Sequence, residues 1–342
     1  MAEKYPMAVV TRPGKIEMIE TALPPLGAED VKIKVKVTTI CGSDLHIFKG
    51  MHPAAPLPVP VGHEIAGEVV EIGSAVTGLK AGDAVAVEPV INCGECHFCL
   101  RGQYHLCTDI SFQYRVGQGG FTPYFVVNSR YAHKLPPGIS FLAGALVEPL
   151  SVAVHAVKKA NPQIGQQAAV FGAGAIGLYV LKLLRISGVE VFMVDINAFR
   201  LSWAEKLGAA AALYNLKGDA NAEIYARTAG LGVDIAFEAV GLESTLVQSL
   251  QSLRKGGTAI LLGLFEQPYI KLPANIFVQK EINLQGSQGY NWDFQDSIAL
   301  LAQGDVDLKS TITHEFSFDQ VQQAFDQLVQ PGNEMIKAAV IL

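Results

Sequence analysis

Four cysteines fall within fifteen residues of this chain, and their spacing is typical of a metal site. The pattern is Cys-x2-Cys-x2-Cys-x7-Cys, formed by Cys93, Cys96, Cys99 and Cys107. Gly94 and Gly102 allow tight turns between the ligands. Four thiolates in tetrahedral geometry match Zn²⁺ with no open coordination position. The pattern predicts a structural zinc site. Four unligated thiols and an iron–sulfur cluster are the alternatives, although the ferredoxin spacing ends in x3-Cys-Pro.

A second concentration of reactive groups is the stretch 41–46, which contains a thiol, a hydroxyl, a carboxylate and an imidazole. Once the quartet is assigned, Cys41 is the remaining cysteine, so a second metal site would need histidine and carboxylate ligands. Glu148 lies inside the apolar run 141–154, where an unpaired carboxylate is costly. Taken singly, His63 is more typical of a buried core histidine, and Glu148 of the start of a helix. The candidate ligands are His63, Glu64 and Glu148.

A glycine-rich turn, Gly172-Ala173-Gly174-Ala175-Ile176-Gly177, follows an apolar strand and opens a helix. Such glycines permit a tight turn and close approach of the backbone to a pyrophosphate, and Asp195, at the end of the next strand, is placed to bind ribose hydroxyls. The setting predicts dinucleotide binding by Gly172, Gly174, Ile176, Gly177 and Asp195. A carboxylate there would repel a 2′-phosphate, which favours NAD over NADP. Arg200 is either a partner for such a phosphate or a solvated charge on a helix.

The elements that must position these groups differ between the two parts of the chain. The first 150 residues are rich in turns and short β-branched runs, such as the alternating run 31–40 that delivers Cys41 to a loop, which predicts a mostly antiparallel β-barrel. Beyond residue 168 strands alternate with amphipathic helices, which predicts a doubly wound parallel sheet. The expected strands are 168–171, 191–194, 233–238, 258–262 and 338–342, and the expected helices are 150–159, 176–187, 199–207, 243–253 and 296–302.

Composition bounds the class of protein. The chain has 342 residues, of which half are apolar and 17% charged, with a formal charge of −6. It should form about two domains, and it offers no basic cluster for nucleic acid or anionic membranes. Residues 1–6 lack the pattern of a signal peptide, which favours a cytoplasmic location. The apolar run 168–194 is interrupted by Lys182, Arg185 and Glu190, so a membrane span is not expected.

The chain resembles the medium-chain, zinc-dependent alcohol dehydrogenases, in the branch of the sorbitol, threonine and butanediol dehydrogenases. The resemblance is carried by residues 40–46, 62–67 and 148–156, together with the cysteine quartet and the glycine-rich turn. It implies an α/β protein with a GroES-like β-barrel catalytic domain, residues 1–150 completed by 286–342, and a Rossmann NAD-binding domain, residues 151–285. It also implies one catalytic and one structural zinc per chain, NAD as cofactor, and a homodimer or homotetramer.

Carried over by residue, the resemblance makes Cys41 and His63 zinc ligands, while Glu64 and Glu148 share the remaining positions with water or substrate. It gives Ser43 the role of taking the substrate proton and His46 that of passing it to solvent. Asp44 would support the histidine ligand. Zinc chemistry agrees with these roles, because a bound alcohol whose pKa is lowered can release hydride to a nicotinamide ring. Apart from the resemblance, Ser43, Asp44 and His46 are also typical of a polar turn.

The substrate prediction is coarser than the family prediction. Sorbitol dehydrogenase-like members carry a tyrosine after the relay histidine and an arginine further on, where this chain has Ile47 and Gly289. Tyr290, Asn291 and Trp292 are candidates to line the pocket instead. The expected reaction is oxidation of a secondary alcohol of a polyol, sugar acid or diol. The alternatives are a threonine 3-dehydrogenase-like activity, a non-catalytic zinc- and nucleotide-binding protein, and a zinc-free quinone reductase.

Overall fold

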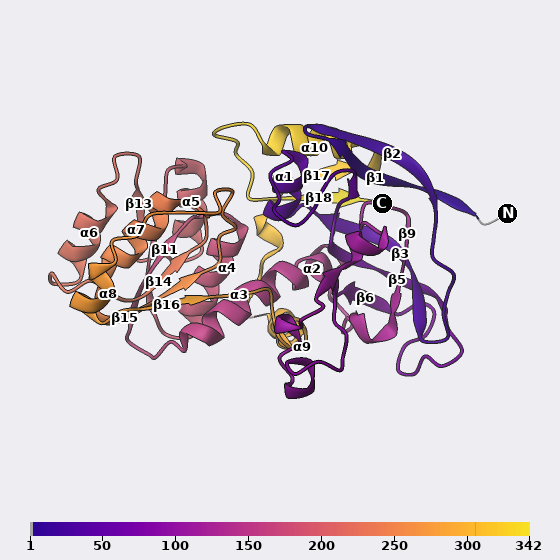
Figure 1. Ribbon diagram of the computed structural model, residues 1–342, viewed down its shortest axis with the longest axis horizontal. Coiled ribbons are helices and arrows are strands. Elements are labelled where there is room, and N and C mark those ends of the chain that lie inside the picture. Colours follow the sequence, from indigo (N-terminus) through magenta and orange to yellow (C-terminus); the bar gives the residue numbers. More distant parts are fainter. Residues whose placement is uncertain (1–2, 305) are drawn as a thin grey trace. The chain divides into compact units, whose positions relative to one another are not determined.

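The computed structural model describes residues 3–304 and 306–342 of the chain (Figure 1). It divides into two compact units, one formed by residues 1–149 and 291–342 and the other by residues 150–290. Residues 1 and 2 of the N-terminal segment interpreted above lie outside the described part. Within the described residues, no helix is long and apolar enough to cross a membrane.

The first unit is built from strands that pair mostly antiparallel. Its large sheet has the order β10-β6-β5-β3-β18-β17, with β9 also paired to β3, and a smaller sheet has the order β2-β1-β4. Its strands are β1 Lys4–Arg12, β2 Lys15–Ala22, β3 Asp30–Thr39, β4 Val59–Pro60, β5 Glu64–Ile72, β6 Ala84–Val87, β7 Val90–Ile91, β8 Ser111–Phe112, β9 Tyr124–Asn128, β10 Ala132–Lys134, β17 Ile312–Ser317 and β18 Lys337–Ile341. Its helices are α1 Gly42–Phe48, α2 Phe141–Ala145, α9 Asp293–Gln303 and α10 Val321–Leu328.

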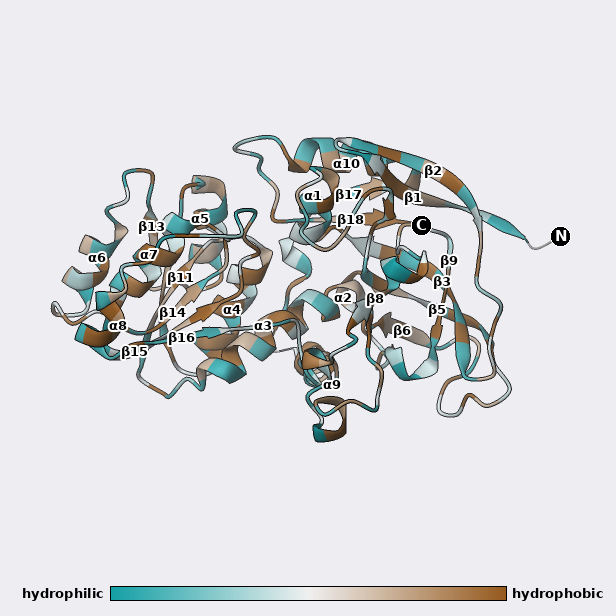
Figure 2. Cartoon of the chain, in the orientation of Figure 1, coloured by the Kyte–Doolittle hydropathy of each residue, from teal (hydrophilic) through white to brown (hydrophobic). Residues whose placement is uncertain are grey.

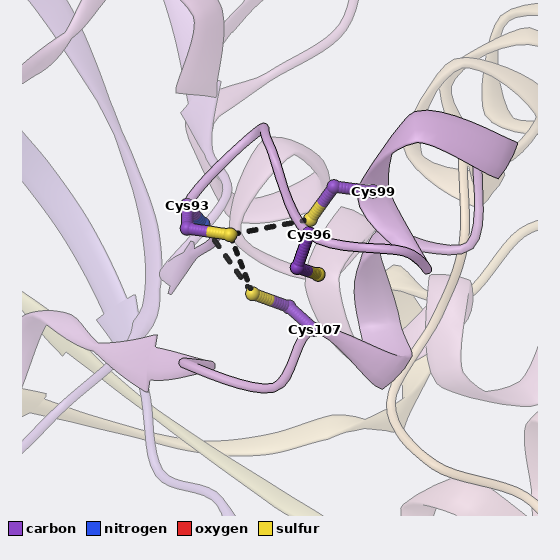
Figure 3. Close-up of side chains that lie close together, drawn as sticks. All are labelled: Cys93, Cys96, Cys99 and Cys107. Carbon is purple, nitrogen blue, oxygen red and sulfur yellow. Dashed lines mark hydrogen bonds between the residues drawn. The ribbon is translucent and has the colours of Figure 1, made fainter.

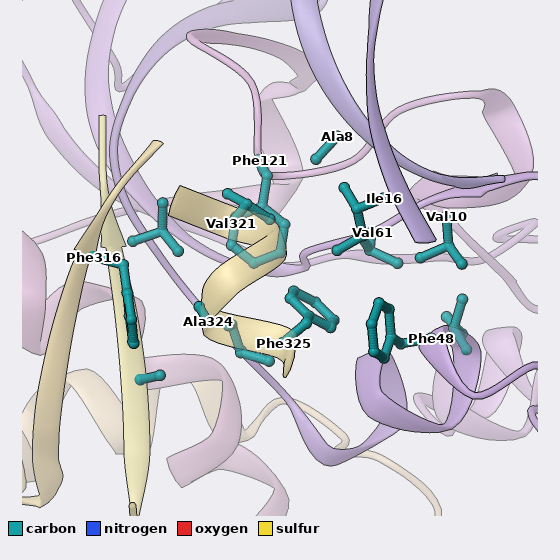
Figure 4. Packing of buried hydrophobic residues seen from close by; sticks show 14 of the residues in the cluster. Ala8, Val10, Ile16, Phe48, Val61, Phe121, Phe316, Val321, Ala324 and Phe325 are labelled. Carbon is teal, nitrogen blue, oxygen red and sulfur yellow. The ribbon is translucent and has the colours of Figure 1, made fainter. Parts of the chain in front are cut away.

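The sequence pattern of β3 explains how this sheet encloses a core. Val31, Ile33 and Val35 are at most 1% exposed, while the lysines between them point the other way, as the two-residue period of a strand requires. A second cluster forms between α1, α10 and the strands β1 and β2, with Phe48, Phe121 and Phe325 packed together (Figure 4). The segment that carries Cys41 is therefore fixed on both sides by apolar packing.

The second unit contains a six-stranded parallel sheet in the order β13-β12-β11-β14-β15-β16. This is the Rossmann order. The chain starts with the central strand β11, adds β12 and β13 on one side, and then adds β14, β15 and β16 on the other side. Its inner strands are buried on both faces, and Figure 2 shows them coloured mainly as hydrophobic. The strands are β11 Gln167–Phe171, β12 Glu190–Asp195, β13 Ala211–Tyr214, β14 Val233–Glu238, β15 Leu253–Leu261 and β16 Asn283–Gly286. The helices are α3 Val147–Ala160, which begins in the first unit, α4 Ala175–Ile186, α5 Ala198–Lys206, α6 Ala220–Arg227, α7 Glu243–Ser252 and α8 Asn275–Lys280.

Two features of the first unit differ from the sequence prediction. The stretch after Cys41 is the short helix α1 rather than a loop, because Cys41 and Asp44 form a capping box that starts a helix there. The C-terminal region contains β17 and α10 as well as the expected helix and final strand. Helix α10 is only eight residues long, which is too short for its period to stand out from the surrounding polar sequence.

Candidate metal centres and dinucleotide site

The four cysteines of the quartet converge from one short stretch of chain (Figure 3). Their sulfur atoms all lie within 4.8 Å of one another, with Cys93 Sγ 3.5 Å from Cys107 Sγ and 4.0 Å from Cys99 Sγ. Tetrahedral zinc with bonds of about 2.3 Å would place its sulfur ligands about 3.8 Å apart, whereas a disulfide needs about 2.05 Å. The four thiols therefore fit a closed zinc site in which every ligand is a cysteine.

Backbone N–H groups surround the sulfur atoms of the quartet and prepare them for a cation. Cys107 Sγ accepts hydrogen bonds from the N–H groups of Cys93 and Asp109, each at 3.4 Å. Backbone hydrogen bonds from Cys99 and Thr108 lower the pKa of Cys96 to about 5, whereas burial raises the pKa of Cys99 to about 12. Such N–H···S contacts orient thiolate ligands. Left-handed turns at Gly94 and Gly102, with φ of 78° and 71°, bring the chain back on itself.

A second group of ligand atoms gathers at the end of strand β3. Cys41, His63 and Glu64 each offer one ligand atom, and these three atoms lie within 4.8 Å of one another. Cys41 ends the segment delivered by β3, and Glu64 opens β5, which pairs with β3 so that Thr39 faces Glu64. The pairing of two strands thus brings together residues more than twenty positions apart. A thiolate, an imidazole and a carboxylate form a donor set that suits Zn²⁺.

Asp44 links the two chain segments that carry this cluster. Its carboxylate is 1% exposed and accepts hydrogen bonds from the N–H groups of Cys41 and Gly62, at 3.1 and 3.2 Å. Its Oδ1 also lies 3.3 Å from His63 Nδ1. Although burial opposes it, the charges of Asp44 and Cys41 raise the pKa of His63 well above its usual value. Asp44 therefore fixes the ring of His63 through Nδ1 and leaves Nε2 for a metal, as carboxylates beside metal-binding histidines commonly do.

Glu64 is held by two partners that the sequence analysis did not find. Lys337 Nζ lies 2.6 Å from Glu64 Oε1, and the hydroxyl of Thr39 donates to Oε2. Glu64 is fully buried and Lys337 is 4% exposed, so the ion pair is shielded from water. The sequence contained one indication of this ion pair, the single lysine at the start of an otherwise apolar final strand. A buried ammonium there needs an acidic partner.

Glu148 lies in the first turn of α3 and is 7% exposed. Burial, together with the charges of Glu64 and Asp44, raises its pKa to about 7, against the opposing charges of His63 and Lys337. The electrostatic coupling places Glu148 near the cluster, although its oxygens are not among the closely grouped ligand atoms of the described residues. Ser43 and His46 both belong to α1 and stand three residues apart, which puts them on the same face of that helix.

In the second unit, the glycine-rich turn joins β11 to α4 and has room for a ligand where the sequence requires it. A side chain at Gly172 or Gly177 would collide with Val240 or with the Gly172 carbonyl, so these two glycines are needed by the fold itself. At Gly174, which caps α4, an added Cβ would meet nothing within 4 Å. Ile176 lies in the first turn of this helix. The open space at a helix N-terminus fits an anionic pyrophosphate.

Asp195 ends β12 and borders this turn. Its Oδ2 accepts from the N–H of Ala173 at 2.6 Å, and its Oδ1 accepts from the N–H of Asn197 at 2.8 Å. Arg200 lies in the first turn of α5, and its buried Nε has no hydrogen-bond partner among the described residues. The turn that Asp195 faces thus fixes its carboxylate. The Nε of Arg200 remains available as a hydrogen-bond donor.

The fold and the two metal-ligand clusters define a zinc-binding oxidoreductase built on a Rossmann unit, and two family models match the chain. The alcohol dehydrogenase GroES-like domain matches residues 27–137, and the zinc-binding dehydrogenase matches residues 175–303. The chain belongs to the medium-chain, zinc-dependent alcohol dehydrogenase family, in its sorbitol dehydrogenase-like branch. This confirms the predicted family, fold class and enzyme class, with zinc and a nicotinamide dinucleotide as cofactors.

Individual relatives agree over nearly the whole chain. Sorbitol dehydrogenase of Bacillus subtilis (strain 168) is 35% identical over 96% of this chain and 94% of that protein. L-Idonate 5-dehydrogenase of Vitis vinifera is 36% identical over 91% of this chain and 88% of that protein. The solved structure of a short chain alcohol dehydrogenase from E. coli CFT073 with NADH has a TM-score of 0.92 and 26% identity, and covers 100% of both chains.

Proposed function

We propose that this enzyme oxidises a secondary hydroxyl of a polyol, sugar acid or small diol and transfers the hydride to NAD. The observation that carries the proposal is the meeting of Cys41, His63 and Glu64 within 4.8 Å in a chain of this family. Relatives named for sorbitol and L-idonate support the substrate class. Both contain secondary hydroxyl groups flanked by other hydroxyls.

In this proposal Cys41 and His63 hold the catalytic zinc, and Glu64 and Glu148 share its remaining coordination positions with water or substrate. Zinc supplies Lewis-acid chemistry, which lowers the pKa of an alcohol so that it loses its proton near neutral pH. Glu64 is the better direct ligand, since its carboxylate is grouped with the ligand atoms of Cys41 and His63 within 4.8 Å and that of Glu148 is not. Glu148, with its pKa raised to about 7, is suited to hydrogen-bond a water or a substrate hydroxyl.

The same proposal gives the proton of the substrate a route along α1. The hydroxyl of Ser43 accepts it, and the imidazole of His46, on the same face of the helix, passes it onward. A histidine titrates close enough to neutral pH to take part in such a transfer. A Ser43→Ala variant should therefore lose about a hundredfold or more in kcat, the usual contribution of a positioned proton acceptor, while its zinc content stays that of the unaltered enzyme.

For the cofactor, we propose NAD bound through Gly172, Gly174, Ile176 and Gly177, with Asp195 on the adenosine ribose and Arg200 beside it. The fixed carboxylate of Asp195 supports NAD because it would face the 2′-phosphate of NADP. The test is kcat/KM with each cofactor. A higher value with NADP would contradict this assignment.

The experiment that tests the proposed function is a spectrophotometric screen of purified enzyme with NAD. Its panel contains polyols, aldonic acids, small diols and the amino alcohol threonine. We expect NADH formation with at least one polyol, aldonate or diol, and none in a Cys41→Ala variant of equal concentration. Activity with threonine alone would replace the proposed substrate class, and no activity with any compound despite bound zinc would contradict the dehydrogenase function.

We further propose a cytoplasmic enzyme that assembles as a homodimer or homotetramer. The five cysteines are free thiols, and a reducing compartment keeps all five available as metal ligands. Enzymes of the resembled branch commonly form dimers or tetramers. Sedimentation equilibrium of the zinc-loaded protein would determine the assembly, and a monomer at micromolar concentration would contradict this part.

A further inference from the structure

A cavity of about 270 Å³ lies in the first unit beside the cysteine quartet, and the proposed reaction makes no use of it. Gly94 and Cys99 of the quartet loop form part of its wall. The cavity is also lined by Glu88, Tyr104, Arg130, His133, Trp292 and Phe294. None of the four candidate ligands of the catalytic zinc borders this cavity. It is therefore a candidate site of its own.

The carboxylate of Glu88 gives the cavity its chemistry. Glu88 directly follows β6 and is 5% exposed. Its Oε2 lies 2.7 Å from His133 Nε2, whereas its Oε1 is buried and has no hydrogen-bond partner among the described residues. Burial, then the charge of Glu88 and a hydrogen-bonding contact with its carboxylate, raise the pKa of Tyr104, so the Tyr104 hydroxyl lies beside Glu88. A buried carboxylate oxygen without a donor is costly, so this atom is suited to receive one from a ligand.

His133 bridges Glu88 and Gln295. Its Nε2 lies 2.7 Å from Glu88 Oε2, and its Nδ1 lies 3.0 Å from Gln295 Nε2. A neutral imidazole can satisfy both contacts, donating at Nε2 and accepting at Nδ1. No lysine or arginine of the described residues forms an ion pair with Glu88.

Aromatic rings form the remaining walls, and one of them is held exposed. The side chain of Trp292 is 66% exposed, and its backbone adopts a left-handed φ of 65°. Its ring nitrogen donates to the Gly102 carbonyl at 2.8 Å, and its ring meets Tyr104 edge-on at 5.2 Å. Phe294 lies against the ring of His133 at 4.9 Å. An unfavourable backbone conformation that keeps a large ring exposed is a feature of binding sites.

We propose that this cavity binds the primary ammonium group of a small organic molecule. The ammonium donates to Glu88 Oε1 and compensates its charge, and the apolar stem of the ligand contacts Trp292 and Phe294. Aromatic faces attract cations, tryptophan most strongly. A neutral donor would leave the carboxylate uncompensated. The proposal is independent of the substrate of the dehydrogenase.

The ligand comes either from the simple amines or from the amino acids, and Arg130 distinguishes these sources. Its Nη2 donates to the carbonyl of Asn92 at 3.0 Å and to the hydroxyl of Tyr131, while the exposed guanidinium keeps further donors free. A carboxylate on the same ligand would pair with it. An amino acid would therefore bind more weakly to an Arg130→Gln variant, and an alkylamine would not.

The test uses the fluorescence of Trp292. The chain has two tryptophans, so a Trp203→Phe variant of the zinc-loaded enzyme reports from Trp292 alone. Titration with n-butylammonium should give a saturable change at one site per chain. In the same background Glu88→Gln should weaken binding at least tenfold, and Glu95→Gln, which removes an exposed carboxylate of the quartet loop, should change it less than twofold. Butyramide, a neutral compound of similar size, should bind at least tenfold more weakly than n-butylammonium.

A Cys41→Ser variant separates this cavity from the catalytic zinc, which is the other position where an amine nitrogen could be bound. It should retain the fluorescence response, and loss of the response would place the amine at the catalytic cluster and overturn the proposal. Equal affinity in Glu88→Gln, or no saturable change, would also overturn it. If Glu88→Gln does not fold by circular dichroism, a crystal of the unaltered enzyme with n-butylammonium decides, and a nitrogen farther than about 3.2 Å from Glu88 contradicts the proposal. γ-Aminobutyrate, titrated with and without Arg130→Gln, then identifies the source.

Discussion

The two metal-ligand clusters of this enzyme are assembled in opposite ways. The quartet comes from a single stretch of fifteen residues, turns on two left-handed glycines and has only sulfur ligands. The catalytic cluster draws Cys41, His63 and Glu64 from two segments and is supported by Lys337 near the C-terminus. The first can close around zinc with local contacts alone, whereas the second requires the sheet to be folded first.

This comparison predicts different consequences of losing each metal. A local, closed site stabilises its own loop, so its loss should reduce stability more than chemistry. A site whose supports belong to the sheet should lose its metal with little effect on the fold. The four experiments that follow test this contrast, beginning with the largest expected effect.

Cys99→Ala should cost the first unit at least about 5 kcal/mol of unfolding free energy, which is less than the apparent zinc-binding energy of small zinc domains because three thiolates remain. The midpoint of thermal unfolding should fall by about 10 °C or more. Differential scanning calorimetry and metal analysis measure the two quantities. A stable variant that still holds as much zinc as the unaltered enzyme would contradict the structural role of the quartet.

Cys41→Ala should lower kcat at least about a thousandfold, because it removes a ligand of the ion that activates the alcohol. The unfolding midpoint should stay within about 3 °C of the unaltered enzyme, in contrast to Cys99→Ala. Cofactor binding, followed by the fluorescence of NADH, should be retained. Turnover near that of the unaltered enzyme would remove Cys41 from the catalytic zinc.

In the protein without its catalytic zinc, Lys337→Met should destabilise the first unit by about 3 kcal/mol, because it leaves the buried carboxylate of Glu64 without its cation. The matched control is Lys36→Met, whose pair with Glu68 is partly exposed at 3.7 Å and should contribute less than about 1 kcal/mol. Urea unfolding of both variants gives the comparison. Equal effects would mean that Lys337 does not compensate the charge of Glu64.

The contrast also explains which parts of the site could be predicted from the sequence. The quartet could be predicted as a zinc site from the sequence because its ligands and glycines are neighbours in the chain. Cys41, His63 and Glu64 were found through a family resemblance, since their proximity depends on pairing that places Thr39 opposite Glu64. Lys337 and Thr39 were missed as partners because the register between β18 and β3, which pairs Ala339 with Thr39, is set by tertiary packing and leaves no local pattern.

The smallest expected effect is a difference in how the two sites respond to acid. In the zinc-free protein the charges of Asp44 and Cys41 raise the pKa of His63 well above its usual value, despite its burial, which favours the protonated imidazole, whose proton zinc must displace. Zinc affinity at the catalytic site should therefore fall as the pH is lowered, because zinc binding displaces the proton of His63. Since the raised pKa belongs to the folded, zinc-free state, the same protonation also stabilises that state below the ordinary histidine pKa, and this contribution is lost as the pH rises through the folded pKa.

Dialysis against a weak chelator at a pH of about 5.5, below the ordinary histidine pKa, should then remove one zinc per chain along with activity, while the quartet retains the other. Simultaneous loss of both ions would contradict the expected difference in acid sensitivity between the two sites.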